Sequence, residues 1–176
     1  MTTGFPIDAP SEASSNSPTG GLSDDPRPSL EETDRRLWLS VLAKAPANRL
    51  EELFETLPEQ PTWSTIRPAE TGMVMVRGRL GGDGNRFNLG EMTMTRGAVR
   101  LGNGVTGLGY VQGRSRRHAE LTAVLDAMLQ STETNSVVSA RIIEPLAREQ
   151  RDARDIRARK AAATKVEFFT MARGEG

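Results

Sequence analysis

The chain has 176 residues, 36% of them hydrophobic and 26% charged, with 23 Lys and Arg residues against 23 Asp and Glu residues. This length supports one folded domain with extensions, and a formal net charge of zero disfavours a general nucleic-acid binder, which is usually strongly basic. The absence of Cys excludes disulfides, a thiol nucleophile, Fe–S ligation and cysteine zinc sites on this chain, and a single His leaves no His-rich metal site.

The N-terminal part is expected to form a tail followed by two helices. Residues 1–28 are dominated by Gly, Pro, Ser, Asn and Asp, so we expect a disordered tail ahead of a domain that spans residues 29–176. A capping box at Ser29–Glu32 predicts that the first helix begins there, and Pro46 ends it. A second, short helix ends at Pro58 and has helically spaced apolar side chains, so the pair predicts a helical hairpin. These side chains are Leu50, Leu53, Phe54 and Leu57.

The next segment has the alternation of half-buried strands. We expect a short strand at residues 62–67, a break at Pro68, and a second strand at residues 73–80, in which apolar and polar side chains alternate. The glycine-rich stretch 81–85 is expected to be a hairpin turn, because Gly and Asn supply the positive φ values that tight turns need. It does not match a phosphate-binding loop, since no helix with a Lys-Ser/Thr pair follows it.

A third strand is predicted to run to Leu101, with a bulge at Gly90 that moves side chains to the other face. Asn103-Gly104 is a strong signal for a type I′ hairpin turn, after which residues 105–112 return antiparallel. The predicted fold is therefore α+β: an antiparallel β-meander of about four strands, with an N-terminal helical hairpin and C-terminal helices packed against it.

An arginine-rich turn joins the last strand to the next helix. Gly113 ends the strand, and Ser115 is a good N-cap for a helix whose apolar stripe contains Leu121, Val124, Leu125, Met128 and Leu129. Arg114, Arg116 and Arg117 crowd the start of this helix, where the helix dipole favours Asp or Glu. We therefore expect an anion opposite the arginines, either a phosphate-bearing ligand or carboxylates from elsewhere.

Together with Gln112, these arginines are the candidate residues for binding substrate phosphates or another anion. His118 and Glu120 are candidate proton-handling groups if the turn meets a shared active site. A buried, hydrogen-bonded role is the simpler alternative for His118, because the residue lies nearly on the apolar stripe of its helix.

Four further arginines lie on the predicted strands. They form either a basic face toward a partner or the solvated face of the sheet. These candidate interface residues are Arg77, Arg79, Arg96 and Arg100.

The C-terminal part also indicates a partner. Beyond Ser131 a helix is predicted to begin near Asn135 or Ser136, with Pro145 kinking or dividing it. Residues 147–164 form helix readily but are polar nearly all round, and such a helix either spans solvent or lies against another chain. The apolar segment that follows must dock on this chain or on a partner. Its candidate interface residues are Phe168, Phe169, Met171 and Arg173.

Several stretches together resemble the PhnG family, a small subunit of the bacterial carbon–phosphorus lyase core complex. The resemblance is carried first by Gly109-Tyr110-Val111-Gln112-Gly113-Arg114 with His118-Ala119-Glu120, and by Val166-Glu167-Phe168-Phe169-Thr170-Met171-Ala172-Arg173-Gly174. Arg67-Pro68-Ala69-Glu70-Thr71-Gly72 and the stretch from Leu80-Gly81-Gly82-Asp83-Gly84 to Thr95-Arg96-Gly97-Ala98-Val99-Arg100-Leu101 fit the family as well. The resemblance runs from Leu37 to Gly174 and leaves the tail outside.

The resemblance implies a role in phosphonate breakdown. In the step concerned, alpha-D-ribose 1-methylphosphonate 5-triphosphate synthase transfers the ribose triphosphate moiety of ATP to methylphosphonate and releases adenine. The implied partners are PhnI, PhnH, PhnJ and PhnL in a hetero-oligomer, with the nucleosidase chemistry attributed to PhnI and an Fe–S cluster to PhnJ. ATP is then a substrate of the complex, and no cofactor is expected on this chain alone. The absence of Cys from this chain agrees with an Fe–S cluster on another subunit.

The leading hypothesis is a structural or accessory subunit of that assembly, with the catalytic residues on its partners. The alternative is a stand-alone phosphate- or nucleotide-binding module that uses the arginine-rich turn. A stand-alone enzyme is disfavoured, because the chain offers no activated nucleophile, metal cluster or second histidine. We expect no nucleic-acid partner, since the chain has one Tyr and single-strand binding needs aromatic side chains. We expect a cytoplasmic protein without a membrane partner, since it has no apolar run of membrane-spanning length and no signal-peptide pattern.

Overall fold

The computed structural model describes residues 30–81 and 83–164. The predicted tail, the Ser29 cap and the apolar segment with Phe168, Phe169, Met171 and Arg173 lie outside the described residues. The elements are α1 (Leu30–Lys44), α2 (Ala47–Glu55), β1 (Trp63–Arg79), β2 (Arg86–Leu101), β3 (Thr106–Gln112), α3 (Arg116–Gln130), α4 (Thr132–Val138), a π-helical turn (Ser139–Ile143) and α5 (Glu144–Ala163). The α+β class, with N-terminal and C-terminal helices against an antiparallel sheet, is confirmed.

The described sheet has three strands in the order β1-β2-β3, all antiparallel, so the prediction of about four strands is wrong. The two strands expected at residues 62–67 and 73–80 are one strand, β1, which continues through Pro68. β1 is an edge strand, where the missing N–H of a proline removes no obligatory ladder bond. The pairing with β2 is shifted in register between Thr65 and Arg67 and between Arg67 and Glu70, and these shifts accommodate the proline.

Of two local features predicted for the sheet, the bulge is present and the turn at Asn103-Gly104 has a different form. The bulge expected at Gly90 is confirmed, because Val76 pairs with Gly90 and Arg77 with Asn88, which leaves Leu89 without a partner in the register. The type I′ turn at Asn103-Gly104 is wrong, since Gly104 has a φ of 88° and no described non-glycine residue has a positive φ. The loop instead has three residues, and the Leu101 N–H donates to the Val105 carbonyl at 2.9 Å.

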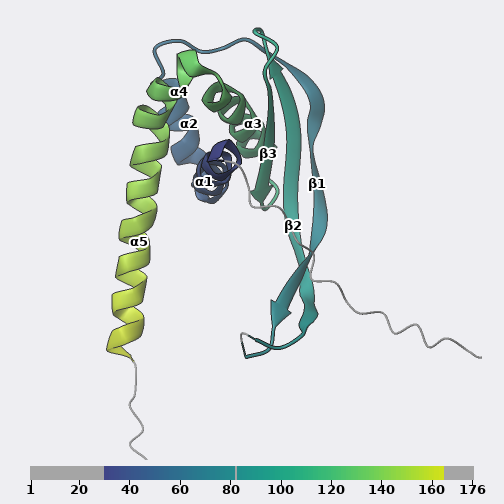
Figure 1. Ribbon diagram of the computed structural model, residues 1–176, viewed down its shortest axis with the longest axis vertical. Helices are drawn as coiled ribbons and strands as arrows, with labels where there is room; N and C mark the ends of the chain where they lie inside the picture. Colours follow the sequence, from purple (N-terminus) through teal and green to yellow (C-terminus); the bar gives the residue numbers. More distant parts are fainter. Residues whose placement is uncertain (1–29, 82, 165–176) are drawn as a thin grey trace, which may run out of the picture.

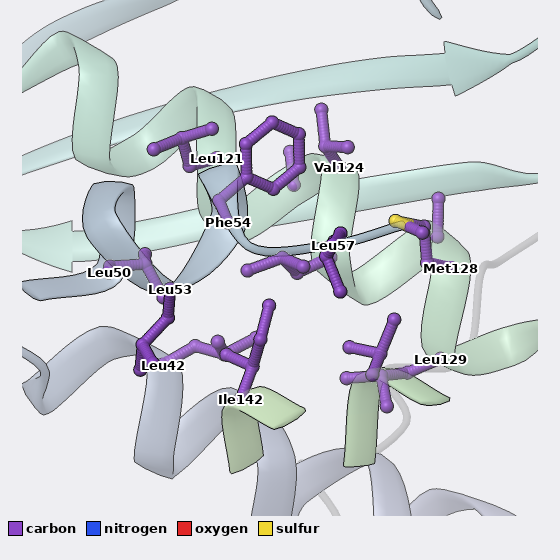
Figure 2. Packing of buried hydrophobic residues seen from close by; sticks show 14 of the residues in the cluster. Leu42, Leu50, Leu53, Phe54, Leu57, Leu121, Val124, Met128, Leu129 and Ile142 are labelled. Carbon is purple, nitrogen blue, oxygen red and sulfur yellow. The ribbon is translucent and has the colours of Figure 1, made fainter. Parts of the chain in front are cut away.

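α3 is the central element of the protein. It lies between the sheet and the two N-terminal helices (Figure 1), and every residue from Leu121 to Leu129 is buried. Side chains from α1, α2 and the π-helical turn close over its far side (Figure 2). The labelled members of this core are Leu42, Leu50, Leu53, Phe54, Leu57, Leu121, Val124, Met128, Leu129 and Ile142. The helix that begins at the arginine-rich turn is therefore held from both sides.

β3 and α3 approach each other backbone to backbone. A Cβ atom at Gly109 would lie 1.9 Å from the Ala119 carbonyl oxygen, and a Cβ atom at Gly107 would lie 1.9 Å from the Ala123 carbonyl oxygen. Only glycine fits at such a distance. Small residues on both elements, Gly-x-Gly on the strand and alanines every four residues on the helix, thus set the position of the α3 N-terminus.

The C-terminal helix differs in detail from its prediction. α4 begins at Thr132 rather than near Asn135, and the chain passes through the π-helical turn before α5. Pro145 lies in the first turn of α5, where its missing N–H interrupts the regular helical bonding of the preceding turn. From Arg151 to the end of α5 every residue is exposed, and the helix extends away from the core (Figure 1). Over the described ranges, no helix combines the length and apolarity needed to cross a membrane.

Candidate functional site

The arginine-rich turn is anchored by a chain of hydrogen bonds to the sheet. Gly113 has a φ of 95°, a left-handed conformation that favours glycine, and its N–H donates to the Thr93 carbonyl at 2.9 Å. The Thr95 hydroxyl donates to the Gly113 carbonyl at 2.7 Å, so the Thr71 hydroxyl, 3.0 Å away, must donate to Thr95. All three strands thus hold the start of the turn in place.

The N-cap predicted at Ser115 is confirmed. Its side-chain oxygen accepts a hydrogen bond from the His118 backbone N–H at 3.2 Å. The cap satisfies one of the free N–H groups at the start of α3, and the remaining ones are available to an anion.

Replacement of Ser115 by alanine is expected to lower the free energy of unfolding by about 1 kcal/mol, because the His118 N–H loses its partner. Ser115→Asp keeps an acceptor at the same place and should restore the stability. Urea denaturation of the three proteins measures the difference. Equal stability of the alanine variant and the parent would show that water replaces the cap at no cost.

Arg117 faces carboxylates from this chain. Its Nε donates to Glu51 of α2 at 3.0 Å, and a second guanidinium nitrogen lies 3.3 Å from Glu120. Partial burial lowers the pKa of Arg117, but the hydrogen bonds to Glu51 and Glu120 outweigh it, so that the pKa is raised above its ordinary value. For this arginine the carboxylate alternative of the sequence analysis applies.

Glu120 is engaged on both of its oxygens. One accepts from the Trp63 indole N–H at 3.1 Å, and the other lies beside Arg117. Trp63 packs edge-on against Phe54, with ring centroids 6.3 Å apart, so Glu120 ties β1 to the helical layer. As a candidate proton-handling group it would first have to release these contacts.

His118 is 5% exposed, and its Nε2 lies 2.9 Å from the Leu42 carbonyl oxygen in the last turn of α1. A carbonyl can only accept, so Nε2 carries the proton and donates it to Leu42. The ring therefore connects the start of α3 to the end of α1, and this contact uses its proton-bearing nitrogen.

Arg114 and Arg116 have no ion pair within the part of the chain that the structure describes. They point to different sides of the turn. Arg114, Gln112 and His118 line a groove of about 1480 Å³ between α1 and α5, which we call the α1–α5 groove. Arg116 lines a smaller hollow of about 450 Å³ beside Arg67. The four candidate anion-binding residues are thus divided between two surfaces.

The α1–α5 groove contains cations that the sequence analysis did not connect with the turn. Arg151, Arg154 and Arg157 recur every three residues on α5 and line the same groove as Arg114. Its apolar lining comes from α1, including Trp38 and Val41, and from Ile143 and Leu146. Asp34 and Glu149 line the groove as well, but the arginines outnumber them, and such a groove suits an anion or an acidic partner segment. No sequence signal joins α5 to the turn, because only the packing of α1 and α5 brings them together.

The strand arginines also differ among themselves. Arg96 and Arg67 both pair with Glu70, and the hydrogen bond from Arg96 is the main cause that lowers the pKa of that carboxyl below its ordinary value. In contrast, Arg77, Arg79 and Arg100 form no ion pair with any described residue. A partner contact remains a prediction for all four strand arginines.

Asp126 is a buried charge that the sequence analysis overlooked. It is 0% exposed and accepts a two-pronged hydrogen bond from Arg35, at 3.1 and 2.7 Å, and one from the Trp38 indole at 2.9 Å. Its second oxygen also accepts from the backbone N–H of Leu108 at 2.9 Å, on the free edge of β3. The sequence did contain a sign of this buried charge, because Asp126 is the one carboxylate in the largely apolar stretch 121–129 of α3.

The described residues contain no group of three or more His, Cys, Asp and Glu side chains that could hold a metal ion. The turn itself offers the guanidinium groups of Arg114 and Arg116, which form no ion pair with a described residue, backbone N–H groups at a helix start, and a histidine and a glutamate engaged in the fold.

Comparison with known proteins covers the arginine-rich turn and the helices and strands around it. A family model described as "Phosphonate metabolism protein PhnG" matches residues 33–174. A protein of Rhizobium meliloti (strain 1021), described as alpha-D-ribose 1-methylphosphonate 5-triphosphate synthase subunit PhnG, is 42% identical over 142 residues. The aligned region covers 80% of this chain and 90% of the relative.

Proposed function

Since the chain belongs to the PhnG family of phosphonate metabolism proteins, we propose that it is the PhnG subunit of an alpha-D-ribose 1-methylphosphonate 5-triphosphate synthase. The observation that carries the proposal is the match to the R. meliloti subunit over nearly the full length of that relative. The subunit has a structural or accessory part in the reaction, and the catalytic residues lie on partner subunits.

The geometry of the candidate catalytic residues supports the accessory part. His118 uses its proton-bearing nitrogen to join α3 to α1, and Glu120 uses both oxygens within the fold. Each group would have to release these contacts before it could act as a general acid or base. Their contacts instead stabilise the turn that carries the arginines.

Arg114 and Arg116 are the residues that we expect to act on the substrates or on a partner. The reaction transfers the ribose triphosphate moiety of ATP to methylphosphonate and releases adenine, so its substrates carry several negative charges. Unpaired guanidinium groups beside a helix N-terminus can bind and orient phosphate or phosphonate oxygens. The same groups would pair equally with acidic residues of the neighbouring subunit. Both uses need the assembled hetero-oligomer, for which PhnI, PhnH, PhnJ and PhnL are the proposed partners, in the cytoplasm.

The test is adenine release from ATP and methylphosphonate by the reconstituted subunits, followed by chromatography. Arg114→Ala/Arg116→Ala is expected to fold normally, because neither side chain has an ion pair in the described structure, and its assembled complex should release adenine about ten- to a hundredfold more slowly. That range corresponds to the loss of one charge-assisted hydrogen bond.

The matched control is Arg36→Ala/Arg148→Ala, which removes two exposed helical arginines away from the turn and should leave the rate unchanged. Full activity of Arg114→Ala/Arg116→Ala would make the protein a scaffold whose arginines serve neither substrate nor partner. Full adenine release without this protein would refute the subunit proposal for this step.

A further inference from the structure

β1 and β2 continue as a two-stranded ribbon beyond the end of β3. The last pair that includes β3 is Gln112 with Met94, whereas β1 and β2 stay paired as far as Arg79 and Arg86. We call residues 73–79 and 86–93 the β-arm; it projects past the helical core (Figure 1). An isolated two-stranded ribbon is marginally stable in water, so an arm of this length gains from a partner.

One face of the β-arm continues the face that packs on α3. Thr95 is buried on that face, and by the two-residue alternation of a strand Thr93 and Glu91 follow on the same side. Their partners on β1 are Met73 and Met75, which are 69% and 50% exposed. The face here exposes two methionines beside Thr93 and Glu91.

The same face becomes basic toward the tip. Arg77 and Arg79 follow Met73 and Met75 by alternation on β1, and Arg79 pairs directly with Arg86 of β2. Like charges directly opposite each other destabilise a strand pair. Neither Asp83 nor Glu91, the carboxylates of the arm and its turn, forms an ion pair with these arginines. The face therefore combines exposed methionines with positive charge that the described residues do not neutralise.

We propose that this face of the β-arm docks on another subunit of the synthase, at an apolar strip edged with Asp or Glu side chains. The inference rests on the proposed function, and charge complementarity is the argument for a partner with carboxylate side chains. Carboxylates of the partner would relieve the repulsion between Arg79 and Arg86, and its apolar side chains would cover Met73 and Met75. Methionine suits such a surface, because its flexible side chain adapts to the partner.

Arg79→Glu tests the proposal in the full-length protein, co-expressed with the partner subunits. The substitution creates an attractive Glu–Arg pair across the strands, so the arm itself should be at least as stable as before. Binding of the partner subunits should nevertheless weaken at least about tenfold, because an interfacial charge is reversed. Titration calorimetry or the ratio of subunits recovered after size-exclusion chromatography measures the effect.

Arg36→Glu is the matched control, since it reverses an exposed arginine of α1 with the same change in net charge, and it should bind as the parent does. Wild-type affinity of Arg79→Glu would overturn the docking proposal. Failure of the parent protein itself to assemble would refute the proposed function instead, so the two failures are distinguishable. Photo-crosslinking through p-benzoylphenylalanine in place of Met75 identifies the occupant: a product with another subunit supports the proposal, and a product confined to this chain or a second copy contradicts it.

Discussion

Replacement of Gly109 by alanine is expected to lower the free energy of unfolding by about 3 kcal/mol or more, at the upper end of the cost of overpacking a core. The new Cβ would lie 1.9 Å from the Ala119 carbonyl oxygen and 3.1 Å from the Ala123 nitrogen. Both are backbone atoms of α3, which is packed on its other side against α1 and α2 and cannot retreat. Strand and helix would have to separate, and the arginine-rich turn would move with them.

Urea denaturation measures this loss, and two further variants make it specific. Gly72→Ala adds the same methyl group to β1, where nothing lies within 4 Å, and should change the stability by less than about 0.5 kcal/mol. Ala119→Gly should not rescue Gly109→Ala, because the clash is with a backbone oxygen rather than a side chain. Parent-like stability of Gly109→Ala would mean that β3 and α3 are not in backbone contact.

Replacement of Asp126 by alanine is expected to cost about 3 kcal/mol, because several donors lose a fully buried acceptor, while its ion-pair partner Arg35 is 34% exposed and can turn to water. The carboxylate is fully buried and receives hydrogen bonds from Arg35, Trp38 and the Leu108 N–H. Without it, the indole and backbone N–H groups lose their acceptor. Asp126→Asn should also be strongly destabilising, because one of its two acceptors becomes a donor that faces other donors.

Thermal or urea unfolding measures the stability, and hydrogen exchange gives a local readout at the Leu108 amide, which should exchange faster in Asp126→Ala. Asp152→Ala removes an exposed carboxylate of α5 and should have little effect, since surface substitutions rarely exceed about 0.5 kcal/mol. Trp38→Phe, which removes a single donor to Asp126, should cost about 1 kcal/mol. A loss in Asp126→Ala no larger than that in Trp38→Phe would show that the carboxylate is not the anchor of α1, α3 and β3.

Much of the architecture followed from local patterns in the sequence. Helical spacing of apolar residues identified α1, α2 and α3, and alternation identified the strands, although it divided β1 into two. Ser115 was recognisable as an N-cap and Gly90 as a bulge, because these features depend on residues within a few positions. The arginine-rich turn was also predictable, since three cations at a helix start conflict with the helix dipole.

Only the tertiary structure decided how those elements and charges meet. Proline at an edge strand is tolerated, but nothing near Pro68 in the sequence says that β1 lies at an edge. Arg117 finds Glu51, and Asp126 finds Arg35, across 66 and 91 residues of chain, so their roles depend on packing rather than spacing. The exposure of the β-arm also depends on the tertiary structure. Its methionines are exposed because β1 and β2 continue beyond the last residue pair of β3. Local propensity thus determines which elements form, whereas burial and charge pairing between distant segments determine which residues remain free to act.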